Sequence, residues 1–204
     1  MQDEFKTINS ESRAETKVNG SRFIATAFPV LTKAEAEQFL AAIRKEFWDA
    51  THNCFAFRFG LNDILFRFND DGEPSGSAGK PILNAIDKYE LTDVLVVVTR
   101  YFGGTKLGVG GLVRAYGDAA EQALVRAEKL TKFRTEVIEV SFSHSQIGNV
   151  MRVVSKVGAR IVDTIYDDDV HTKLEIRLSK VEELKSALIN QTSGSVSLKR
   201  KIAE

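Results

Sequence analysis

The apolar and polar residues in the first half of the chain alternate in patterns typical of both strands and helices. Residues 22–30 place bulky groups such as Phe23 among small ones, which predicts a strand. Directly behind it, Thr32 and Glu35 have the spacing of a capping box. Apolar residues then recur at helical intervals, at Ala36, Phe39, Leu40, Ile43 and Phe47. We therefore expect a strand followed at once by an amphipathic helix.

Three more strands are expected along this half. Residues 54–59 and 64–68 alternate, and the Gly60-Leu61-Asn62-Asp63 sequence between them suits a hairpin turn. Phe55, Phe57 and Phe59 should face one layer. Val94–Val98 consists of five consecutive aliphatic residues and has no polar face. Such a run predicts a strand at the centre of the sheet, covered on both sides.

A loop and two helices complete the first half. Residues 69–79 carry Asp, Gly, Pro and Ser without periodicity and should form a loop, which a short helix at 81–89 follows. Apolar residues from Leu112 to Ala127 have the period of a long helix. The polar and basic segment Lys129–Arg134 then interrupts the pattern. We place a domain boundary there and expect domains of residues 1–130 and 131–204.

The second half has the element order βαββαβ. The expected elements are a strand at 138–142, a helix at 147–157 ended by Gly158, strands at 160–166 and 170–178 around a turn at 167–169, a helix from 181 capped by Ser179, and a strand at 196–198. About 70 residues in this order suggest a split-βαβ, ferredoxin-like domain with one antiparallel sheet and two helices. The fold class predicted for the whole chain is α+β.

Composition and charge exclude several classes of protein. The 204 residues are 43% hydrophobic and carry 28 basic and 28 acidic groups, which is typical of a globular protein and not of a disordered or collagen-like one. No apolar run is long enough to span a bilayer, and the acidic N-terminus lacks the features of a signal peptide. We therefore expect a cytoplasmic protein that does not bind membranes. One cysteine and three scattered histidines favour neither a disulfide nor a structural metal.

Glycines and cations gather between the aliphatic strand and the long helix. Six of the 14 glycines lie in residues 103–117, and residues 94–117 contain three basic residues and no acid. A glycine turn at a helix N-terminus offers free amides and the positive end of the helix dipole to phosphate or carboxylate. The candidate residues are Arg100, Gly103, Gly104, Lys106, Gly108, Gly110, Gly111 and Arg114, with Lys80, Arg58 and His52 behind them.

Other interpretations of the glycines remain open. The P-loop and Rossmann patterns both fail in this segment, and the glycines can instead serve tight turns and close packing of helix on sheet. Tyr101 and Phe102 can stack on bases or pack into the core. The anion hypothesis requires that the amides of residues 103–111 are not already bound to acceptors of the protein itself.

Two further groups of residues carry weaker signals. Asp70, Asp71, Glu73 and Ser75 lie in a loop that can act as a flexible lid over the glycine turn, ligate Mg²⁺, or simply be solvated or cap the next helix. His52 and Cys54 point to the same face of a strand and can form a nucleophile pair, although a lone buried cysteine usually serves packing. We predict no cofactor and no metal ligand set.

Three strings of residues in order resemble the YigZ/IMPACT family, in its bacterial two-domain form. They are Ala50-Thr51-His52-Asn53-Cys54 with Ala56 and Arg58; Asp70-Asp71-Gly72-Glu73-Pro74 with Gly76, Ala78, Gly79 and Pro81; and Arg100-Tyr101-Phe102-Gly103-Gly104 with Leu107, Gly108, Gly110, Gly111 and Arg114-Ala115-Tyr116. The resemblance implies an N-terminal domain like domain 2 of a ribosomal protein and the GHMP kinases. It also implies a C-terminal domain like the last domain of elongation factor G.

The family resemblance implies a role near translation, since its eukaryotic members regulate the phosphorylation of an initiation factor. The leading hypothesis is a translation-associated regulatory protein that binds RNA, the ribosome or a phosphate-bearing ligand through the glycine turn. A Mg²⁺-dependent enzyme acting on a phosphorylated small molecule is the first alternative. A protein-interaction module with an unknown protein partner is the second. On balance, binding is favoured over catalysis.

Overall fold

The computed structural model describes residues 3–60 and 64–201 and is mixed α and β, as the sequence predicts. The chain divides into two compact units. One is Phe5–Lys132, and the other combines Asp3 and Glu4 with residues 133–201. The sequence placed this division at residue 130 and left the first residues with the first domain. Asp3 belongs to the second unit because its carbonyl accepts from the amide of Arg134 at 2.8 Å and its carboxylate accepts from Ser179. The short pair of β1 (Glu4–Ile8) and β7 (Lys129–Phe133) lies almost wholly within the first unit.

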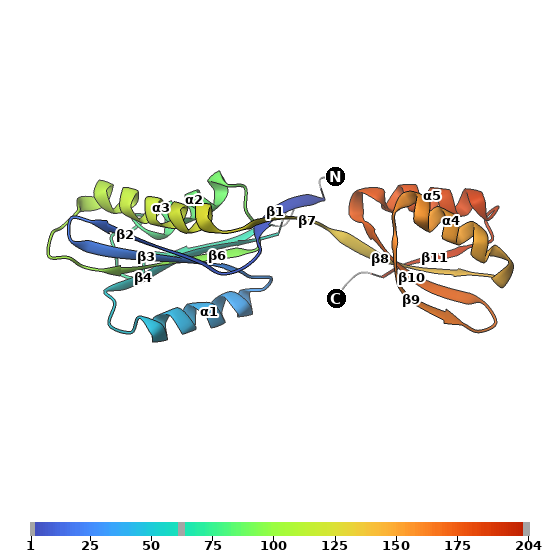
Figure 1. Ribbon diagram of the computed structural model, residues 1–204, viewed down its shortest axis with the longest axis horizontal. Coiled ribbons are helices and arrows are strands. Elements are labelled where there is room, and N and C mark those ends of the chain that lie inside the picture. The colour runs from blue at the N-terminus through green and yellow to red at the C-terminus, as the bar shows by residue number, and fades with distance from the viewer. Residues whose placement is uncertain (1–2, 61–63, 202–204) are drawn as a thin grey trace. The chain divides into compact units, whose positions relative to one another are not determined.

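A five-stranded antiparallel sheet forms the centre of the first unit. Its order is β2 (Ser12–Val18), β3 (Ser21–Pro29), β6 (Val94–Tyr101), β4 (His52–Phe59) and β5 (Leu65–Asn69). Helices α2 (Gly79–Lys88) and α3 (Gly108–Arg126) cover one face, and α1 (Lys33–Glu46) covers the other (Figure 1). The sheet is therefore the middle layer of three.

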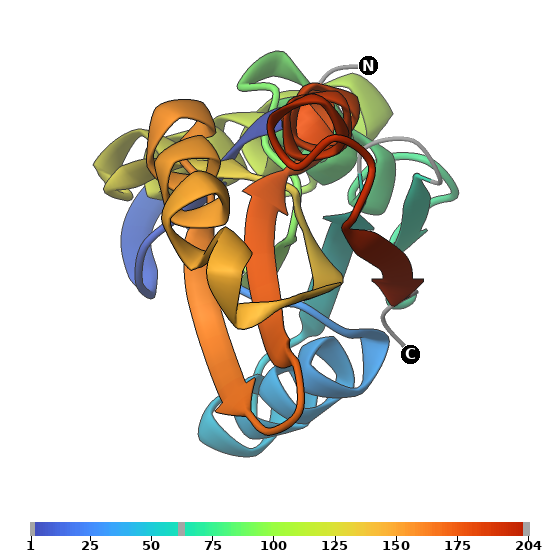
Figure 2. The same cartoon turned by 90° about the vertical axis from the view of Figure 1, so that its right-hand side faces the viewer.

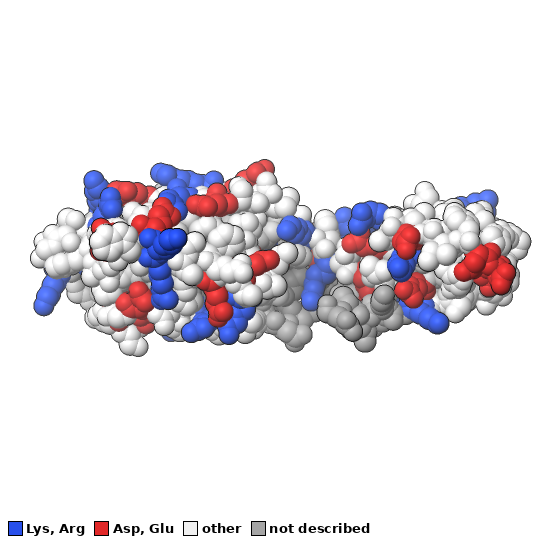
Figure 3. Space-filling model, turned by 90° about the horizontal axis from the view of Figure 1, so that it is seen from below, with Lys and Arg blue, Asp and Glu red and all other residues white. Residues whose placement is uncertain are grey.

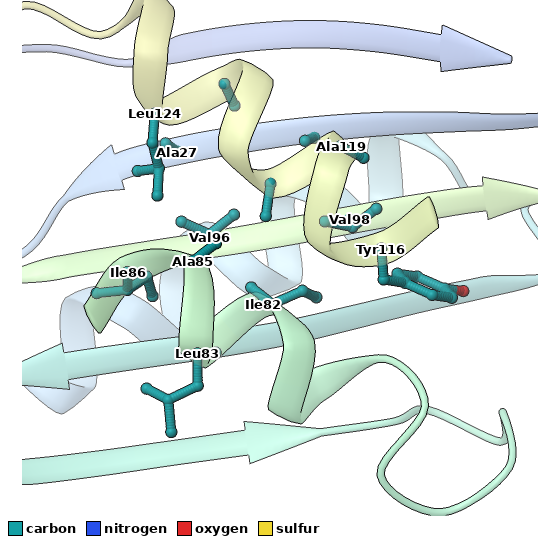
Figure 4. Packing of buried hydrophobic residues seen from close by; sticks show 14 of the residues in the cluster. Ala27, Ile82, Leu83, Ala85, Ile86, Val96, Val98, Tyr116, Ala119 and Leu124 are labelled. Carbon is teal, nitrogen blue, oxygen red and sulfur yellow. The ribbon is translucent and has the colours of Figure 1, made fainter. Parts of the chain in front are cut away.

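The central strand β6 is buried on both faces, as its aliphatic run predicts. Val96 and Val98 pack beneath α2 and α3, against residues such as Ile82 (Figure 4). Leu95 and Val97 face the layer under α1. That layer also contains the three phenylalanines of β4, so the prediction that they share one face is confirmed. Thr32 accepts a hydrogen bond from the amide of Glu35 at 3.2 Å, which confirms the predicted start of α1.

The second unit is a ferredoxin-like domain, as predicted. Its elements are β8 (Thr135–Phe142), α4 (Ile147–Val157), β9 (Arg160–Tyr166), β10 (Val170–Arg177), α5 (Val181–Gln191) and β11 (Ser197–Lys201), with 3₁₀ turns at His144–Gln146 and Leu178–Lys180. The antiparallel sheet has the order β11-β8-β10-β9, and both helices lie on one face (Figure 2). Gly158 ends α4 with φ 81°, in the left-handed region.

The structure corrects several local predictions. Ser179 does not cap α5, because its hydroxyl donates to Asp3 at 2.5 Å and α5 starts without a side-chain cap. β1, β2 and β7 were not predicted. β2 alternates charged residues with small ones, so it lacks the bulky apolar positions that mark a strand. Part of the predicted hairpin turn, residues 61–63, lies outside the described residues. Among the helices that are described, none has the length and apolar character of a membrane span.

Candidate functional site

The glycine turn between β6 and α3 lies beside two other loops at one end of the first unit (Figure 1). The amide of Gly103 donates to Ser21 Oγ at 3.1 Å, which ties the turn to the start of β3. The amide of Phe102 donates to Thr51 Oγ1 at 3.1 Å, and the amide of Thr51 donates to the carbonyl of Arg100 at 2.9 Å. These bonds fix the segment before β4 against the end of β6.

Most amides of the glycine turn are not bound to acceptors of the protein itself, as the anion hypothesis requires. Residues 102–106 and 108–110 are exposed. Within the described part of the chain, the amides of residues 104–107 have no protein acceptor, whereas that of Gly103 is used by Ser21. Helix α3 has no side-chain cap and no acidic residue in its first turn. Its positive end therefore faces solvent without an anion from the protein.

The glycines of this turn serve two different purposes. A Cβ on Gly103 would lie 1.9 Å from the carbonyl carbon of Gly20, so this glycine is required by close backbone packing. Gly104 has φ 87° and nothing near the position of a Cβ, so it shapes an open turn. The packing interpretation therefore holds for Gly103, while Gly104, Gly108 and Gly110 lie in open space or beside a flexible side chain.

The predicted cations are not equivalent. Lys106 and Arg114 are exposed, and neither forms an ion pair with a described residue. Lys80 is exposed in the first turn of α2, and Arg58 is paired with Asp87. Arg100 is only 5% exposed. Its assignment as a ligand-binding cation is therefore revised, because a buried guanidinium does not reach a ligand in solvent.

Arg100 instead forms a buried ion pair with Glu73. The guanidinium donates to Glu73 Oε1 at 2.6 Å and to Ser21 Oγ at 3.3 Å. The hydroxyl of Tyr116 donates to the same carboxylate oxygen at 2.7 Å. His52 Nε2 lies 3.7 Å from it. Because Ser21 also accepts from Gly103, Arg100 positions the base of the glycine turn.

The acidic loop is held by hydrogen bonds rather than free to act as a lid. The Asp70 carboxylate accepts from the amides of Gly76, Ala78 and Gly79 at 2.8, 3.0 and 2.8 Å. Burial alone raises the pKa of Asp70, but these donors outweigh it and the net pKa is lowered. Asp70 thus occupies the N-terminus of α2, which is the capping alternative.

The remaining loop residues also have structural partners, apart from Ser75. Asp71 accepts from the amide of Asn53 at 2.8 Å and from Arg44 at 3.0 Å. Glu73 is buried against Arg100, and Ser75 is exposed. We therefore revise the assignment of Asp70, Asp71 and Glu73 to a lid. The described residues contain no group of three or more His, Cys, Asp and Glu arranged to hold a metal ion.

His52 and Cys54 lie beneath this loop. His52 Nδ1 is 2.8 Å from the carbonyl oxygen of Asp71, and the thiol of Cys54 donates to the carbonyl of Asp70 at 3.0 Å. Burial raises the pKa of Cys54 to about 12. The raised pKa and the hydrogen bond to the backbone favour the packing interpretation of Cys54.

Two exposed aromatic side chains come from the turn itself and from the segment that precedes β4. Phe102 is 47% exposed, and Trp48 is 82% exposed in the segment that is bonded to the end of β6. Tyr101 is tied down, since its hydroxyl donates to Asp49 at 2.8 Å and Arg22 lies 4.5 Å from its ring centroid. Sequence analysis assigned no role in the site to Trp48, Ser21 or Tyr116. Of these three, only Trp48 could have been noticed in the sequence, because it is the single tryptophan of the chain and directly follows a predicted helix.

Charge does not gather into one large patch on the face seen in Figure 3. Basic and acidic side chains are interspersed there. At the glycine turn itself, an anion would be attracted by the open amides and by the two exposed cations Lys106 and Arg114.

Comparison with family models assigns both halves of the chain. The model described as the Impact N-terminal domain matches residues 19–124. A second model, described as a domain of unknown function (DUF1949), matches residues 140–195. The first match covers β3 through most of α3 and so contains the whole candidate site.

Individual proteins resemble the chain over most or all of its length. The IMPACT family member YvyE of Bacillus subtilis is 33% identical over 199 residues, which cover 98% of this chain and 92% of that protein. An IMPACT family member in the pol 5′ region of Thermus thermophilus is 50% identical over 125 residues, or 61% of this chain and 65% of that protein. A crystal structure described as a hypothetical protein has 27% identity and a TM-score of 0.70 and covers 100% of both chains.

Proposed function

This chain belongs to the IMPACT family, and we propose that it is a translation-associated regulatory protein that binds RNA through the phosphate groups, at its glycine turn. Family membership supports a translation-related regulatory role in general terms. The proposal of RNA as ligand is more specific and rests on the chemistry of the turn. A role of this kind implies a cytoplasmic location.

The observation that carries the proposal is the open backbone of residues 104–107. Residues 104–106 are exposed and Leu107 is half-buried, and none of their four amides has an acceptor among the described residues. They precede a helix of 19 residues that has neither a side-chain cap nor an acid in its first turn. Unpaired amides at a helix N-terminus are a common binding arrangement for phosphate.

Two kinds of side chain, in the turn and in the segment before β4 that is bonded to it, support RNA over a small phosphate. Lys106 and Arg114 are exposed cations on either side of the start of α3. Phe102 and Trp48 expose rings on which unpaired bases can stack. A small anion would use the amides and cations only, whereas single-stranded RNA would use the rings as well.

The test is RNA binding as a function of salt. Fluorescence anisotropy with a labelled single-stranded RNA should give an affinity that falls steeply with salt concentration. The double variant Lys106→Ala/Arg114→Ala should reduce the salt slope by about 0.7 for each phosphate that these two cations neutralise. Trp48→Ala should weaken binding by about 1–3 kcal/mol with little change in the slope, because it removes stacking.

A matched control separates this site from general charge. Arg152→Ala/Lys156→Ala removes two exposed cations from α4 and should leave the affinity and the slope unchanged. Equal binding by the wild type and the Lys106/Arg114 variant would rule out the glycine turn as the RNA site. Loss of binding in the α4 variant alone would move the site to the second unit.

The acidic loop does not support the enzyme alternative. That alternative rested on the GHMP-kinase-like fold that the resemblance implies and on loop carboxylates that could close over the turn, with Mg²⁺ expected. Asp70, Asp71 and Glu73 are instead bound to backbone amides, Arg44 and Arg100.

A further inference from the structure

Strand β5 leaves one edge of the first unit's sheet without a partner. In the described sheet β5 pairs with β4 alone, so the outward N–H and C=O groups of Leu65–Asn69 have no neighbouring strand. Proteins usually protect such edges with lysine, proline or a β-bulge. β5 has the sequence LFRFN, contains one charge, and pairs with β4 without a register shift. Because Gly79 packs closely against the backbone of Asn69, the open and largely apolar part of this edge is residues 65–68.

Apolar side chains of β5 are also exposed on both faces. Phe66 and Phe68 are 54% and 39% exposed. They pair with Arg58 and Ala56, on the face of the sheet that carries α2 and α3. Alternation places Leu65 and Arg67 on the opposite face. Leu65 is 52% exposed.

A groove runs along the inner side of this edge. It has a volume of about 480 Å³ and lies between α1 and β5, with Phe55, Phe57 and Leu95 among its apolar lining residues. Arg67 lines it, and its guanidinium lies 5.9 Å from the ring centroid of Phe55. One helix thus covers only part of this face of the sheet, and the uncovered strip lies beside the free edge.

The charge of the groove selects the chemistry of an occupant. Its charged lining residues are Arg44, Arg67 and Glu37, so basic groups outnumber acidic ones. Arg44 is paired with Asp71 at 3.0 Å. Arg67 is more than half exposed, and its ion pair with Glu37 is long, at 4.0 Å, and exposed to solvent, so it contributes little. Arg67 is therefore the group that an incoming carboxylate would contact.

We propose that β5 receives an extended segment of a partner protein, in which acidic and apolar residues alternate, as a sixth strand of the sheet. The backbone of the segment pairs with the free edge. Its acidic side chains lie beside Arg67, on the face of the sheet that carries α1, and its apolar side chains lie beside Phe66 and Phe68 on the other face. This interaction uses none of the residues of the glycine turn, so it is independent of RNA binding.

A second copy of the chain fits this edge less well than such a segment. Antiparallel pairing of two β5 strands about their centre would place the two Arg67 side chains directly opposite each other. Like charges in that position destabilise a strand pair. Acidic residues in a partner strand give the complementary charge instead.

A synthetic peptide tests the proposal. A fluorescein-labelled peptide of sequence Val-Glu-Val-Glu-Val-Glu-Val should bind the full chain saturably and slow hydrogen exchange at the amides of residues 65–69. Two further peptides carry N-methyl groups on every second amide. The first is methylated at the odd-numbered amides and the second at the even-numbered ones. Because alternate amides of a strand point to the same side, one methylated peptide should lose binding and the other should keep it.

Charge variants complete the test. Arg67→Glu should weaken binding about tenfold, and a peptide with Lys in place of Glu should prefer this variant to the wild type. Arg152→Glu, on α4, is the matched control and should change neither affinity. Circular dichroism checks that both variants are folded.

Three results would overturn the proposal. They are the absence of saturable peptide binding, equal binding by both methylated peptides, and concentration-dependent dimerisation that protects residues 65–69 without peptide. The last would assign the edge to a second copy of the chain.

Discussion

Helices α2 and α3 begin at the same end of the first unit, but only one of these N-termini is filled by the protein. At α2, the Asp70 carboxylate accepts hydrogen bonds from three amides of the loop and the first turn. At α3, the amides of residues 104–107 have no acceptor among the described residues, and no side chain caps the helix. The free amides at a helix N-terminus need a hydrogen-bond acceptor, preferably an anion. The protein supplies one at α2, whereas at α3 the amides face solvent.

This difference separates a structural loop from a candidate binding loop. Both segments are rich in glycine and precede a helix. In the acidic loop the protein supplies the anion. The carboxylates of this loop already accept hydrogen bonds from the protein, and these bonds hold the loop in place. In the glycine turn no anion is supplied, while Arg100 and Ser21 hold the base of the turn from below. The buried pair of Arg100 and Glu73 connects the two.

The largest effect is expected from breaking that connection. Glu73→Ala removes the carboxylate that accepts from Arg100 and Tyr116 and leaves a buried guanidinium without its counter-charge. The loss in unfolding free energy should be about 3–5 kcal/mol, measured by urea denaturation. The double variant Glu73→Ala/Arg100→Met should lose less than the sum of its two single variants. A loss below about 1 kcal/mol in Glu73→Ala would show that the pair does not stabilise the fold.

An intermediate effect is expected at the filled helix N-terminus. Asp70→Ala leaves three amides without an acceptor and should cost about 1–2 kcal/mol at pH 7. Because the pKa of Asp70 in the folded state is below the ordinary 3.8, its contribution is complete above that pH. The contribution is lost as the pH falls through the lower, folded-state pKa. The difference between wild type and variant should therefore be constant near neutrality and shrink in acid.

A matched control for this prediction is Asp118→Ala. Asp118 is an exposed acid on α3 for which no hydrogen bond or ion pair is seen with the described residues. This variant should change stability by less than about 0.5 kcal/mol. A difference between wild type and Asp70→Ala that grows toward low pH would contradict the assignment of Asp70 as an ionised cap.

The contrast between the two loops also shows what the sequence could and could not predict. The strand at Val94–Val98 and the βαββαβ order were correct, because long apolar runs and strong periodicity are local signals. The burial of Arg100 was not foreseen, since its partner Glu73 is 27 positions away and only the folded sheet brings them together. Asp70 had several open interpretations because its acceptor role depends on how the loop folds back on residues 76–79. The glycine turn was found by composition, although Gly103 serves packing.

The smallest effect on stability, and the most selective effect on binding, is expected at Gly110. Gly110 lies in the first turn of α3, and the only atom near an added Cβ is the end of the Arg114 side chain at 3.8 Å. Gly110→Ala should raise stability by up to about 1 kcal/mol, because alanine is the better helix former. The added methyl group would also lie beside the end of Arg114, one of the two cations proposed to contact RNA, so RNA affinity should fall in the anisotropy assay.

Gly103→Ala is the opposing control and should unfold the turn, since its Cβ would overlap the backbone of Gly20. Unchanged RNA affinity in a stabilised Gly110→Ala variant would place the ligand away from the N-terminus of α3.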